Sequence, residues 1–384
     1  MSERSAPHIA IVGAGPGGLT LASILHLHDI HAVVFEREAF SSARPQGGSL
    51  DMHPDAGQFA IRCAGLSEEF KHIARYEDQE LRIYDKYGRL LLVDADVTGK
   101  DRPEVDRGQL RQMLLDSLPS GVVRWDHELT AARQRDDNTF ELEFRNGWSE
   151  RFDLVIGADG AWSRLRPLLS DEQPIYSGVM FVALGVDDAD VRHPELAQIV
   201  GRGMMFALGD SKVIIGHRDA NSHLGIYAGM RVPVDWVETS GLDWSSGEAV
   251  KASLADQFSD WSEDLLQLIY RSGAGGGKVA PRPIYALPVG HRWEHRPGVT
   301  LLGDAAHLMS PFGGDGANLA MRDATDLALA LASHKDWRAG VQGSEITMFA
   351  RAEEAAASAR DAIDEVFSAE GLAHILHVMK EQRR

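Results

Sequence analysis

The feature that most constrains this chain is a glycine-rich segment close to its beginning. An apolar run at 8–12 leads into Gly13-Ala-Gly-Pro-Gly-Gly18, and helical periodicity follows over 19–28. A second apolar run at 32–35 ends at Glu36, which lies 36 − 18 = 18 residues beyond the last glycine. In a βαβ unit, this order brings backbone N–H groups to a pyrophosphate and an acid to a ribose. The pattern predicts an α/β, Rossmann-like dinucleotide-binding fold.

A second strand–turn–helix pattern lies near the other end of the chain. A short strand pattern at 299–302 ends at Gly303, where the backbone can turn and place Asp304 at the strand end. Asp304 is then positioned to accept hydrogen bonds from a polyol, although a Gly-Asp pair alone is equally typical of an ordinary turn. A loop poor in side chains follows, with a helix after it whose first backbone N–H groups face the loop. The loop residues are Pro311, Gly313, Gly314 and Gly316.

Two further segments carry candidate phosphate contacts. A buried strand pattern ends in the glycine turn that contains Asp159, and Arg164 and Arg166 follow closely enough to meet phosphate charge. Arg107 stands in the first turn of a helix capped by Asp106. Because the helix dipole disfavours a cation there, Arg107 calls for another partner such as a pyrophosphate or flavin oxygen. A solvated arginine is the alternative.

Composition excludes several classes of function. The chain has 384 residues, is 44% hydrophobic and carries a net charge of −18, which argues against nucleic acid as a partner. The single cysteine, Cys63, excludes an internal disulfide and multi-cysteine metal sites, and suits a reducing cytoplasm. No apolar stretch reaches membrane-spanning length, and no histidine has metal-site spacing. We expect a cytoplasmic protein with no metal and no membrane partner, and favour a monomer over an obligate oligomer.

Periodicity predicts the remaining elements. We expect helices at 56–71, 107–118, 248–270 and 345–380, a hairpin at 79–93 on the edge of the first domain, antiparallel strands at 122–125, 139–145 and 148–152, a β-sheet over 175–232 and a strand at 283–287. The expected domains are a discontinuous cofactor domain, 1–171 with 273–343, a β-sheet substrate domain, 172–272, and a C-terminal helix, 344–384.

The three motifs together resemble those of class A flavin monooxygenases of the para-hydroxybenzoate hydroxylase type. The resemblance rests on the first glycine motif, on Gly157-Ala-Asp-Gly160, and on Gly303-Asp-Ala-Ala-His307 with its following loop. It implies that Glu36 and Arg37 contact the adenosine ribose of FAD. The residues assigned to cofactors are Gly13, Gly15, Gly17, Gly18, Glu36, Arg37, Arg44, Asp51, Arg107, Asp159, Gly303, Asp304, Pro311, Gly314, Gly316, Ala317 and Asn318.

Within that class, the segment 43–53 is similar to a loop of the TetX-type tetracycline-inactivating monooxygenases. The resemblance implies that Arg44 contacts NADPH and that Asp51 contacts the flavin; a solvated hairpin tip is the alternative. The substrate domain departs from that group. Alignment places Ala183, Gly203 and Tyr227 where the group carries a glutamine, an arginine and a histidine thought to hold tetracycline, and Asp315 replaces another glutamine.

The resemblance implies hydroxylation of a small aromatic or polyketide substrate, a tetracycline-type antibiotic among the candidates, with FAD, NADPH and molecular oxygen. No catalytic protein residue is nominated, because a flavin C4a hydroperoxide carries the chemistry in this class. Candidate substrate contacts are Met205, His217, Tyr227, Phe312 and Gly313, although periodicity favours a core position for Met205 and a surface position for His217. A flavin reductase or dehydrogenase of the same fold and a non-catalytic, ligand-sequestering flavoprotein remain alternatives.

Overall fold

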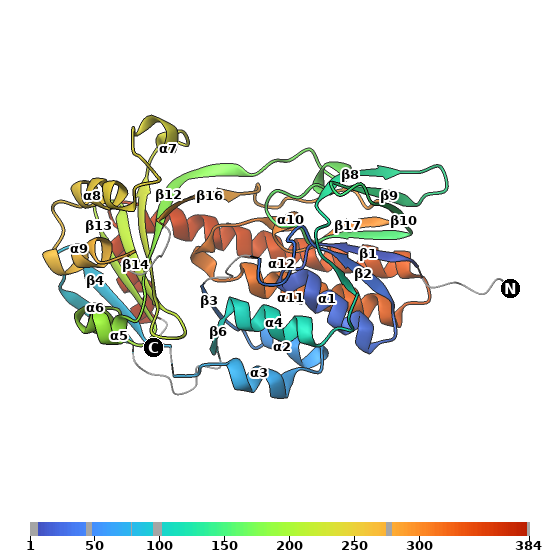
Figure 1. Ribbon diagram of the computed structural model, residues 1–384, viewed down its shortest axis with the longest axis horizontal. Coiled ribbons are helices and arrows are strands. Elements are labelled where there is room, and N and C mark those ends of the chain that lie inside the picture. Colours follow the sequence, from blue (N-terminus) through green and yellow to red (C-terminus); the bar gives the residue numbers. More distant parts are fainter. Residues whose placement is uncertain (1–6, 44–47, 78, 95–101, 274–278, 382–384) are drawn as a thin grey trace. The chain divides into compact units, whose positions relative to one another are not determined.

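The computed structural model describes residues 7–43, 48–77, 79–94, 102–273 and 279–381, which form an α/β protein with two compact units (Figure 1). The first unit comprises 1–74, 107–175 and 286–359, and the second comprises 75–106, 176–285 and 360–384. No helix in the described ranges has the length and hydropathy that a membrane-spanning segment requires.

A five-stranded parallel sheet with the order β17-β11-β1-β2-β7 forms the centre of the first unit. Its strands are β1 (Ile9–Val12), β2 (Ala32–Phe35), β7 (Val123–Arg124), β11 (Leu154–Gly157) and β17 (Val299–Leu301). Every residue of β1, β11 and β17 is buried, as expected for a parallel sheet covered by helices. The α/β fold that the first glycine motif predicts is therefore confirmed.

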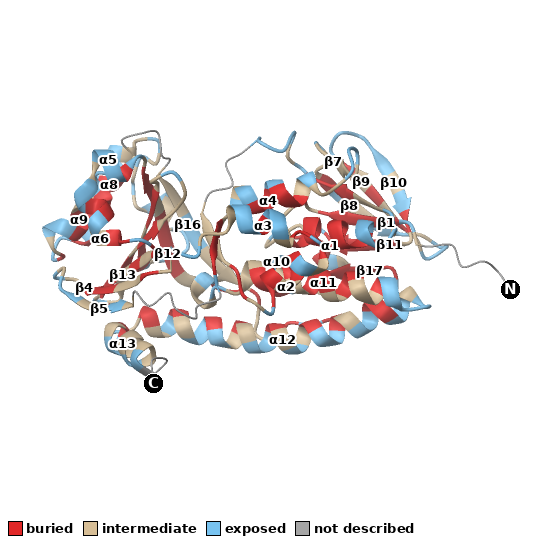
Figure 2. Cartoon of the chain, turned by 90° about the horizontal axis from the view of Figure 1, so that it is seen from below, coloured by how far each residue is buried: buried red, intermediate tan, exposed pale blue. Residues whose placement is uncertain are grey.

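Helices surround this sheet. Those of the first unit are α1 (Pro16–Leu27), α2 (Gly57–Cys63), α3 (Ser67–Ile73), α4 (Arg107–Asp116), α10 (Asp304–His307), α11 (Gly316–Ser333) and most of α12 (Trp337–Val366), with short 3₁₀ turns at Arg166–Leu168 and Pro311–Gly313. α1 packs against α4 and α11. α12 buries one stripe, visible as a red band in Figure 2, that includes Val341, Met348, Ala352 and Ala359.

An antiparallel sheet of three strands also belongs to the first unit, in the order β10-β9-β8. Its strands are β8 (Leu129–Gln134), β9 (Phe140–Phe144) and β10 (Ser149–Phe152). The prediction that 122–125 is the third antiparallel strand is wrong, because β7 pairs in parallel with β2 instead. The short strand β3 (Ser49–Asp51) also belongs to this unit.

The second unit contains a seven-stranded sheet with the order β16-β12-β15-β14-β13-β4-β5. The strands are β4 (Leu81–Asp85), β5 (Leu90–Asp94), β12 (Ile175–Val186), β13 (Met204–Gly209), β14 (Lys212–Arg218), β15 (Leu224–Arg231) and β16 (Ala280–Ala286), and the unit also holds β6 (Glu104–Asp106). One sheet face forms an apolar core with helices of the unit. These helices are α5 (Ala189–Arg192), α6 (Pro194–Val200), α7 (Trp236–Thr239), α8 (Gly247–Gln257) and α9 (Glu263–Tyr270), and α13 (Gly371–Glu381) follows later.

Long-range pairing moves the boundaries away from those expected. The hairpin at 79–93 forms as β4 and β5, but it belongs to the second unit, because β4 pairs in parallel with β13. Residues 360–384 also join that unit, where Asp364 accepts a hydrogen bond from Arg231 at 2.9 Å. The compact units therefore differ from the expected domains, which ended the first segment at residue 171 and treated 344–384 as a separate C-terminal helix.

Two expected helices are each divided in two. The helix predicted at 56–71 stops after Cys63, and Gly65, with φ of +73°, turns the chain before α3 begins. The helix predicted at 248–270 breaks after Gln257. A new helix starts where the Ser262 hydroxyl accepts a hydrogen bond from the backbone N–H of Leu265.

Candidate functional site

Glycines have two different roles in the turn between β1 and α1. A Cβ on Gly13 would lie 2.3 Å from the carbonyl oxygen of Ala158, and a Cβ on Gly18 would lie 2.1 Å from that of Gly13. These positions must be glycine so that the strand, the turn and the helix can pack together. A Cβ on Gly15 would meet nothing within 4 Å. Gly15 also caps α1 without a side-chain hydrogen bond, so backbone N–H groups of the first turn remain available to an anion.

The acid at the end of β2 is held beside this turn. Glu36 is buried, and its carboxylate accepts hydrogen bonds from the backbone N–H groups of Ala14, at 2.8 Å, and Glu38, at 3.0 Å. A carboxylate has about four lone-pair directions, so oxygens remain to accept from a ribose hydroxyl. Arg37, the next residue, is exposed. The positions of both residues fit the expected nucleotide contact.

Sequence reasoning missed Arg111, a buried arginine on α4. Its guanidinium donates to the carbonyl oxygens of Ala14, at 3.0 Å, and Ser41, at 2.7 Å, and to the Glu38 carboxylate, at 3.0 Å. Arg111 therefore fixes α4 to the first glycine turn. The signal was available, because Arg111 falls beside Leu110 and Leu114 on the apolar stripe of the helix.

Arg107, four residues before Arg111 on the same helix, has different surroundings. It is exposed at the start of α4, and its guanidinium makes no hydrogen bond or ion pair with any described residue. Its backbone N–H donates to the carbonyl oxygen of Gly48 at 3.0 Å. An arginine without a protein partner at a helix N-terminus fits the expected contact with an anionic ligand.

The turn after β11 is arranged differently from the expectation. Asp159 accepts a hydrogen bond from the backbone N–H of Arg164 at 2.7 Å, while its other oxygen is buried near Gly157 with no partner among the described residues. Burial raises the pKa of Asp159. The side chain therefore faces inward and shapes the turn. Gly160 is the open position here, since a Cβ on it would meet nothing within 4 Å.

The expectation that Arg166 meets phosphate is wrong. Its side chain is 1% exposed and donates to the carbonyl oxygens of Ala161, at 2.8 Å, Ala305, at 2.9 Å, and Asp304, at 3.2 Å. Burial lowers the pKa of this guanidinium. Arg166 therefore joins the turn after β11 to the turn after β17, whereas Arg164 is exposed.

The turn after β17 presents Asp304 to solvent. Gly303 adopts φ of +57° and ψ of −141°, and a Cβ on it would lie 2.7 Å from the Cβ of Ala320. Glycine is therefore required by both conformation and packing. The carboxyl ends of the adjacent strands β1, β11 and β17 thus carry all three motif turns, which is where open α/β sheets bind ligands.

The loop before α11 gathers another group of expected site residues. Pro311, Phe312 and Gly313 form a 3₁₀ turn, Gly314 follows with φ of +70°, and α11 starts at Gly316 without a side-chain cap. Ala317 lies in the uncapped first turn. The loop therefore leaves backbone N–H groups available for a ligand.

Asn318 fastens this loop to the segment that contains Asp51. Its side-chain oxygen accepts from the backbone N–H groups of His53, at 2.9 Å, and Gly57, at 3.1 Å, and its nitrogen donates to the carbonyl oxygen of Asp51 at 2.8 Å. The Asn318 side chain is thus occupied by the protein. His53 in turn lies 3.0 Å from the Asp51 carboxylate and 3.6 Å from that of Asp315. Arg44, the expected NADPH contact, lies outside the described residues.

The substrate candidates of the second unit have different surroundings. Met205 is fully buried in the apolar core, as periodicity favoured. Tyr227 is half-buried on the opposite face, since its neighbours Ile226 and Ala228 point into the core. Phe312 and Gly313, the two candidates outside the second unit, belong to the first unit.

The surface position favoured for His217 is wrong. The residue is 8% exposed, and its ring nitrogens lie 3.1 Å from the Asp219 carboxylate and 3.6 Å from the Glu104 carboxylate. Burial alone would lower the pKa of His217, but the two carboxylates outweigh it and raise this pKa to about 9. Glu104 was not foreseeable as a partner, because it lies far away in the sequence. The described histidines, cysteines and carboxylates contain no group of three able to hold a metal ion.

Comparison with known proteins agrees with this geometry. Residues 7–345 match a family model described as an FAD binding domain. The monooxygenase penA of Penicillium thymicola is 33% identical over 371 residues, covering 85% of each chain. The structure is similar to that of Klebsiella pneumoniae HpxO with FAD and uric acid, with a TM-score of 0.80, 22% identity and coverage of 97% and 92%. It is also similar to tetracycline destructase Tet(51), with a TM-score of 0.71, 20% identity and coverage of 98% and 96%.

Fold, motif turns and relatives define a flavin-dependent oxidoreductase. The chain belongs to the FAD binding domain family, and it is an FAD-dependent monooxygenase.

Proposed function

We propose that this monooxygenase uses NADPH to hydroxylate a small planar phenol or enolised polyketide. The observation that carries the proposal is the meeting of three motif turns at the carboxyl ends of β1, β11 and β17. In the overall reaction, one oxygen atom of O₂ enters a C–H bond of the substrate and the other leaves as water. NADPH supplies the two electrons, and a proton is consumed.

The first unit supplies contacts along the whole length of FAD. Open backbone at Gly15 and the uncapped start of α1 receive the pyrophosphate, Glu36 and Arg37 receive the adenosine ribose, and Asp304 accepts from a ribityl hydroxyl. Bound FAD supplies the redox and oxygen chemistry. Backbone N–H groups in the uncapped first turn of α11 would stabilise negative charge on the bound flavin. Arg107 adds a cation beside the phosphates or the flavin.

The sheet face opposite the apolar core of the second unit supports the substrate class. Phe206, Ile215, Tyr227 and Ala183 form one cross-strand row over β13, β14, β15 and β12, and all four are half-buried. The ring centroid of Phe181 lies 6.3 Å from that of Tyr227. Such a row suits the face of a planar aromatic molecule better than a densely polar one. HpxO binds the planar molecule uric acid, which agrees with a planar substrate, but uric acid is more polar than this row favours.

The same row weighs against tetracycline itself as the preferred substrate. Ala183 and Tyr227 are direct cross-strand neighbours, and they stand where the tetracycline-inactivating group carries a glutamine and a histidine. The methyl group of alanine cannot replace the hydrogen bonds of an amide, and the phenol hydroxyl donates and accepts from a different position than the ring nitrogens of an imidazole. We therefore propose a substrate with fewer polar groups on its face.

Oxygen and NADPH consumption across a panel of phenols, enols and tetracyclines tests the proposal. A true substrate should raise both rates together and give a product heavier by one oxygen atom. A reductase or dehydrogenase would turn over equally well without oxygen. A sequestering protein would bind a compound without changing either rate, and either result would contradict the proposal.

A further inference from the structure

A buried cluster of charged side chains lies directly behind Asp304. The Asp323 carboxylate, on α11, is 2.6 Å from Nε2 of His307 and 2.8 Å from the Arg351 guanidinium, which comes from α12. Arg351 also donates to Asp326 at 2.9 Å. His307 and Asp323 are 6% and 4% exposed, so neither can touch a cofactor directly. The last residue of the Gly303–His307 motif thus has a partner inside the protein.

One oxygen of Asp323 holds both ends of α10. It accepts from Nε2 of His307, the last residue of this helix, and from the backbone N–H of Gly303, its N-cap, at 3.1 Å. Gly303 has the unusual backbone conformation that directs Asp304 outward. Asp323 therefore fixes the peptide from which the exposed carboxylate projects.

The charges of the cluster support one another. Burial opposes ionisation of Asp323, but His307 and Arg351 outweigh it and lower the pKa of the carboxyl. Burial also opposes a charged His307, but Asp323, with Asp304 further away, outweighs it and raises the pKa of the imidazole. Among the described residues, Arg351, His291 and Glu353 are further charged or titratable groups near the pair, and Glu345 lines a cavity together with Asp323. Both directions favour the ionised pair, an imidazolium bonded to a carboxylate.

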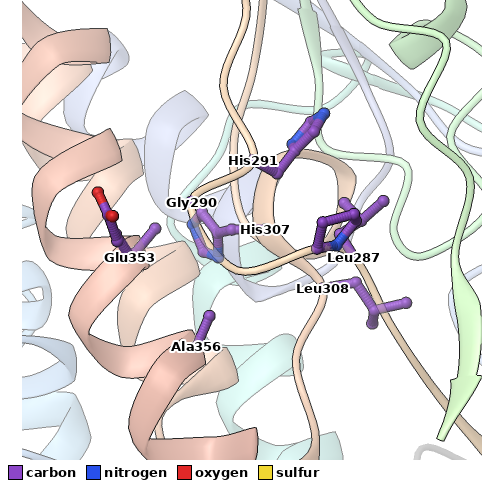
Figure 3. A pocket seen from close by; sticks show the side chains of 9 residues that line it. Leu287, Gly290, His291, His307, Leu308, Glu353 and Ala356 are labelled. Carbon is purple, nitrogen blue, oxygen red and sulfur yellow. The ribbon is translucent and has the colours of Figure 1, made fainter.

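The other nitrogen of His307 adjoins a small cavity. Nδ1 is buried and has no hydrogen-bond partner among the described residues. His307 lines a cavity of about 10 Å³ together with His291, Gly290, Leu308 and Glu353, as Figure 3 shows. This volume suits a single water molecule, which would accept the second proton of the imidazolium. The surroundings of His307 thus accommodate its charged form on both sides of the ring.

We propose that His307 and Asp323 are positioning residues for FAD, which act by locking the Gly303–Asp304 turn in the conformation that receives the ribityl chain. The inference rests on the Asp304–ribityl contact of the proposed function. Arg351 keeps Asp323 oriented from the other side. His307 and Asp323 are too buried to contact the cofactor, so their effect on FAD passes through the turn.

A matched pair of carboxylates on α11 tests the inference. Asp323→Asn removes the negative charge and one of the two acceptor oxygens, so the side chain can no longer accept from both Arg351 and the Gly303–His307 side, while Arg351 stays bonded to Asp326. Asp326→Asn changes the other partner of Arg351 instead. Residue 326 is a suitable control because it is Asp323 that accepts from Gly303 in the turn. Titration of the full-length apoprotein with FAD should give a Kd raised at least about tenfold for Asp323→Asn and by less than about twofold for Asp326→Asn. Equal FAD affinities in the two variants would overturn the inference.

His307→Gln provides a second readout if Asp323→Asn does not fold. Glutamine keeps an N–H donor but carries no charge. In the wild type, the Kd for FAD should rise as pH increases through the raised pKa of His307, whereas the Kd of His307→Gln should be higher at neutral pH and flat over that range. A wild-type Kd and pH profile in this variant would also overturn the inference.

Asp304→Ala separates failure of the inference from failure of the proposed function. If Asp304→Ala weakens FAD but Asp323→Asn and His307→Gln do not, the positioning role is wrong and the ribityl contact stands. If Asp304→Ala leaves FAD affinity unchanged, the ribityl contact is itself wrong and the inference falls with it.

Discussion

Each unit of this protein buries a histidine beside carboxylates, but the two clusters are built in different ways. His307 in the first unit has one direct carboxylate partner, Asp323, with the cation Arg351 on the other side. His217 in the second unit lies between two carboxylates, those of Glu104 and Asp219. The first cluster holds the Gly303–Asp304 turn, to which we assign a cofactor contact, while the second fastens a strand of the sheet to Glu104.

The difference shows how the two units are specified. The motif turns of the first unit are made of backbone, and Gly13, Gly18 and Gly303 are fixed by contacts of 2.1–2.7 Å that any Cβ would violate. The region of the second unit that we assign to the substrate is a row of side chains on a sheet, and these side chains differ in size and chemistry. Changes in the first unit should therefore affect FAD, and changes in the second should spare it.

Glycine substitutions should give the largest effect. In Gly18→Ala the new methyl group meets the Gly13 carbonyl oxygen, which is backbone and cannot move, so we expect a loss of more than about 3 kcal/mol of stability and of bound FAD. In Gly229→Ala the new methyl group would lie 2.4 Å from the ring of Phe181, a side chain that can rotate away. This variant should lose about 1–3 kcal/mol of stability and retain its FAD. Thermal unfolding and flavin absorbance measure both. If Gly18→Ala kept its full FAD content, the predicted difference between changes in the first unit and changes in the second would be wrong.

Asp304→Ala should produce the next largest effect. Removing a charged hydrogen-bond acceptor should weaken FAD binding by about 1.5–3 kcal/mol without unfolding the protein. Tyr227→Ala is the matched change in the second unit, and it should raise the KM for substrate while the Kd for FAD stays at the wild-type value. Fluorescence titration gives the FAD affinities. Weaker FAD binding in Tyr227→Ala would show that the two sides of the site are not separable as described.

The His217 cluster should give a smaller, pH-dependent effect. The folded-state pKa of about 9 lies above the ordinary 6.5, so the stabilisation is fully present below about pH 6.5 and is lost as pH rises through about 9. Between these limits, we expect the wild type to lose about 1–3 kcal/mol that His217→Gln does not lose. Denaturant unfolding at several pH values measures it. Parallel pH profiles in the two proteins would mean that His217 is not charged.

Arg44→Ala should have the smallest effect on the resting protein. We assign Arg44 to NADPH, because a guanidinium can bind its phosphates in a bidentate manner. Flavin content and the unfolding midpoint should stay nearly unchanged, while flavin reduction slows at low NADPH and recovers at high NADPH. Stopped-flow bleaching of the flavin absorbance reports the rates. Loss of FAD, or wild-type reduction rates, would assign the loop a different role.

The sequence predicted most of the first unit because its information is local. The first motif, Glu36 and the Gly303–Asp304 turn follow from glycines and acids at short spacings. The roles of Arg111, Arg166 and Asp323 escaped prediction, since each depends on which backbone carbonyl or N–H group comes near in three dimensions. A buried arginine and a phosphate-binding arginine look alike in sequence.

The second unit was less predictable for the same reason. Its β-rich character could be read from alternation, but the parallel pairing of β4 with β13 joins residues more than a hundred positions apart. That pairing, and not any local motif, moves residues 75–106 into this unit. The burial of His217 beside Glu104 is another result of long-range packing.

Isotope labelling tests the central claim most directly. The protein should be supplied with NADPH and oxygen-18 gas in the presence of whichever planar phenol or enol most stimulates NADPH consumption, and the product analysed by mass spectrometry. The account predicts one oxygen-18 atom per product molecule, with one NADPH oxidised for each. Product formed without oxygen-18, or NADPH oxidation that yields only hydrogen peroxide with every compound, would contradict it.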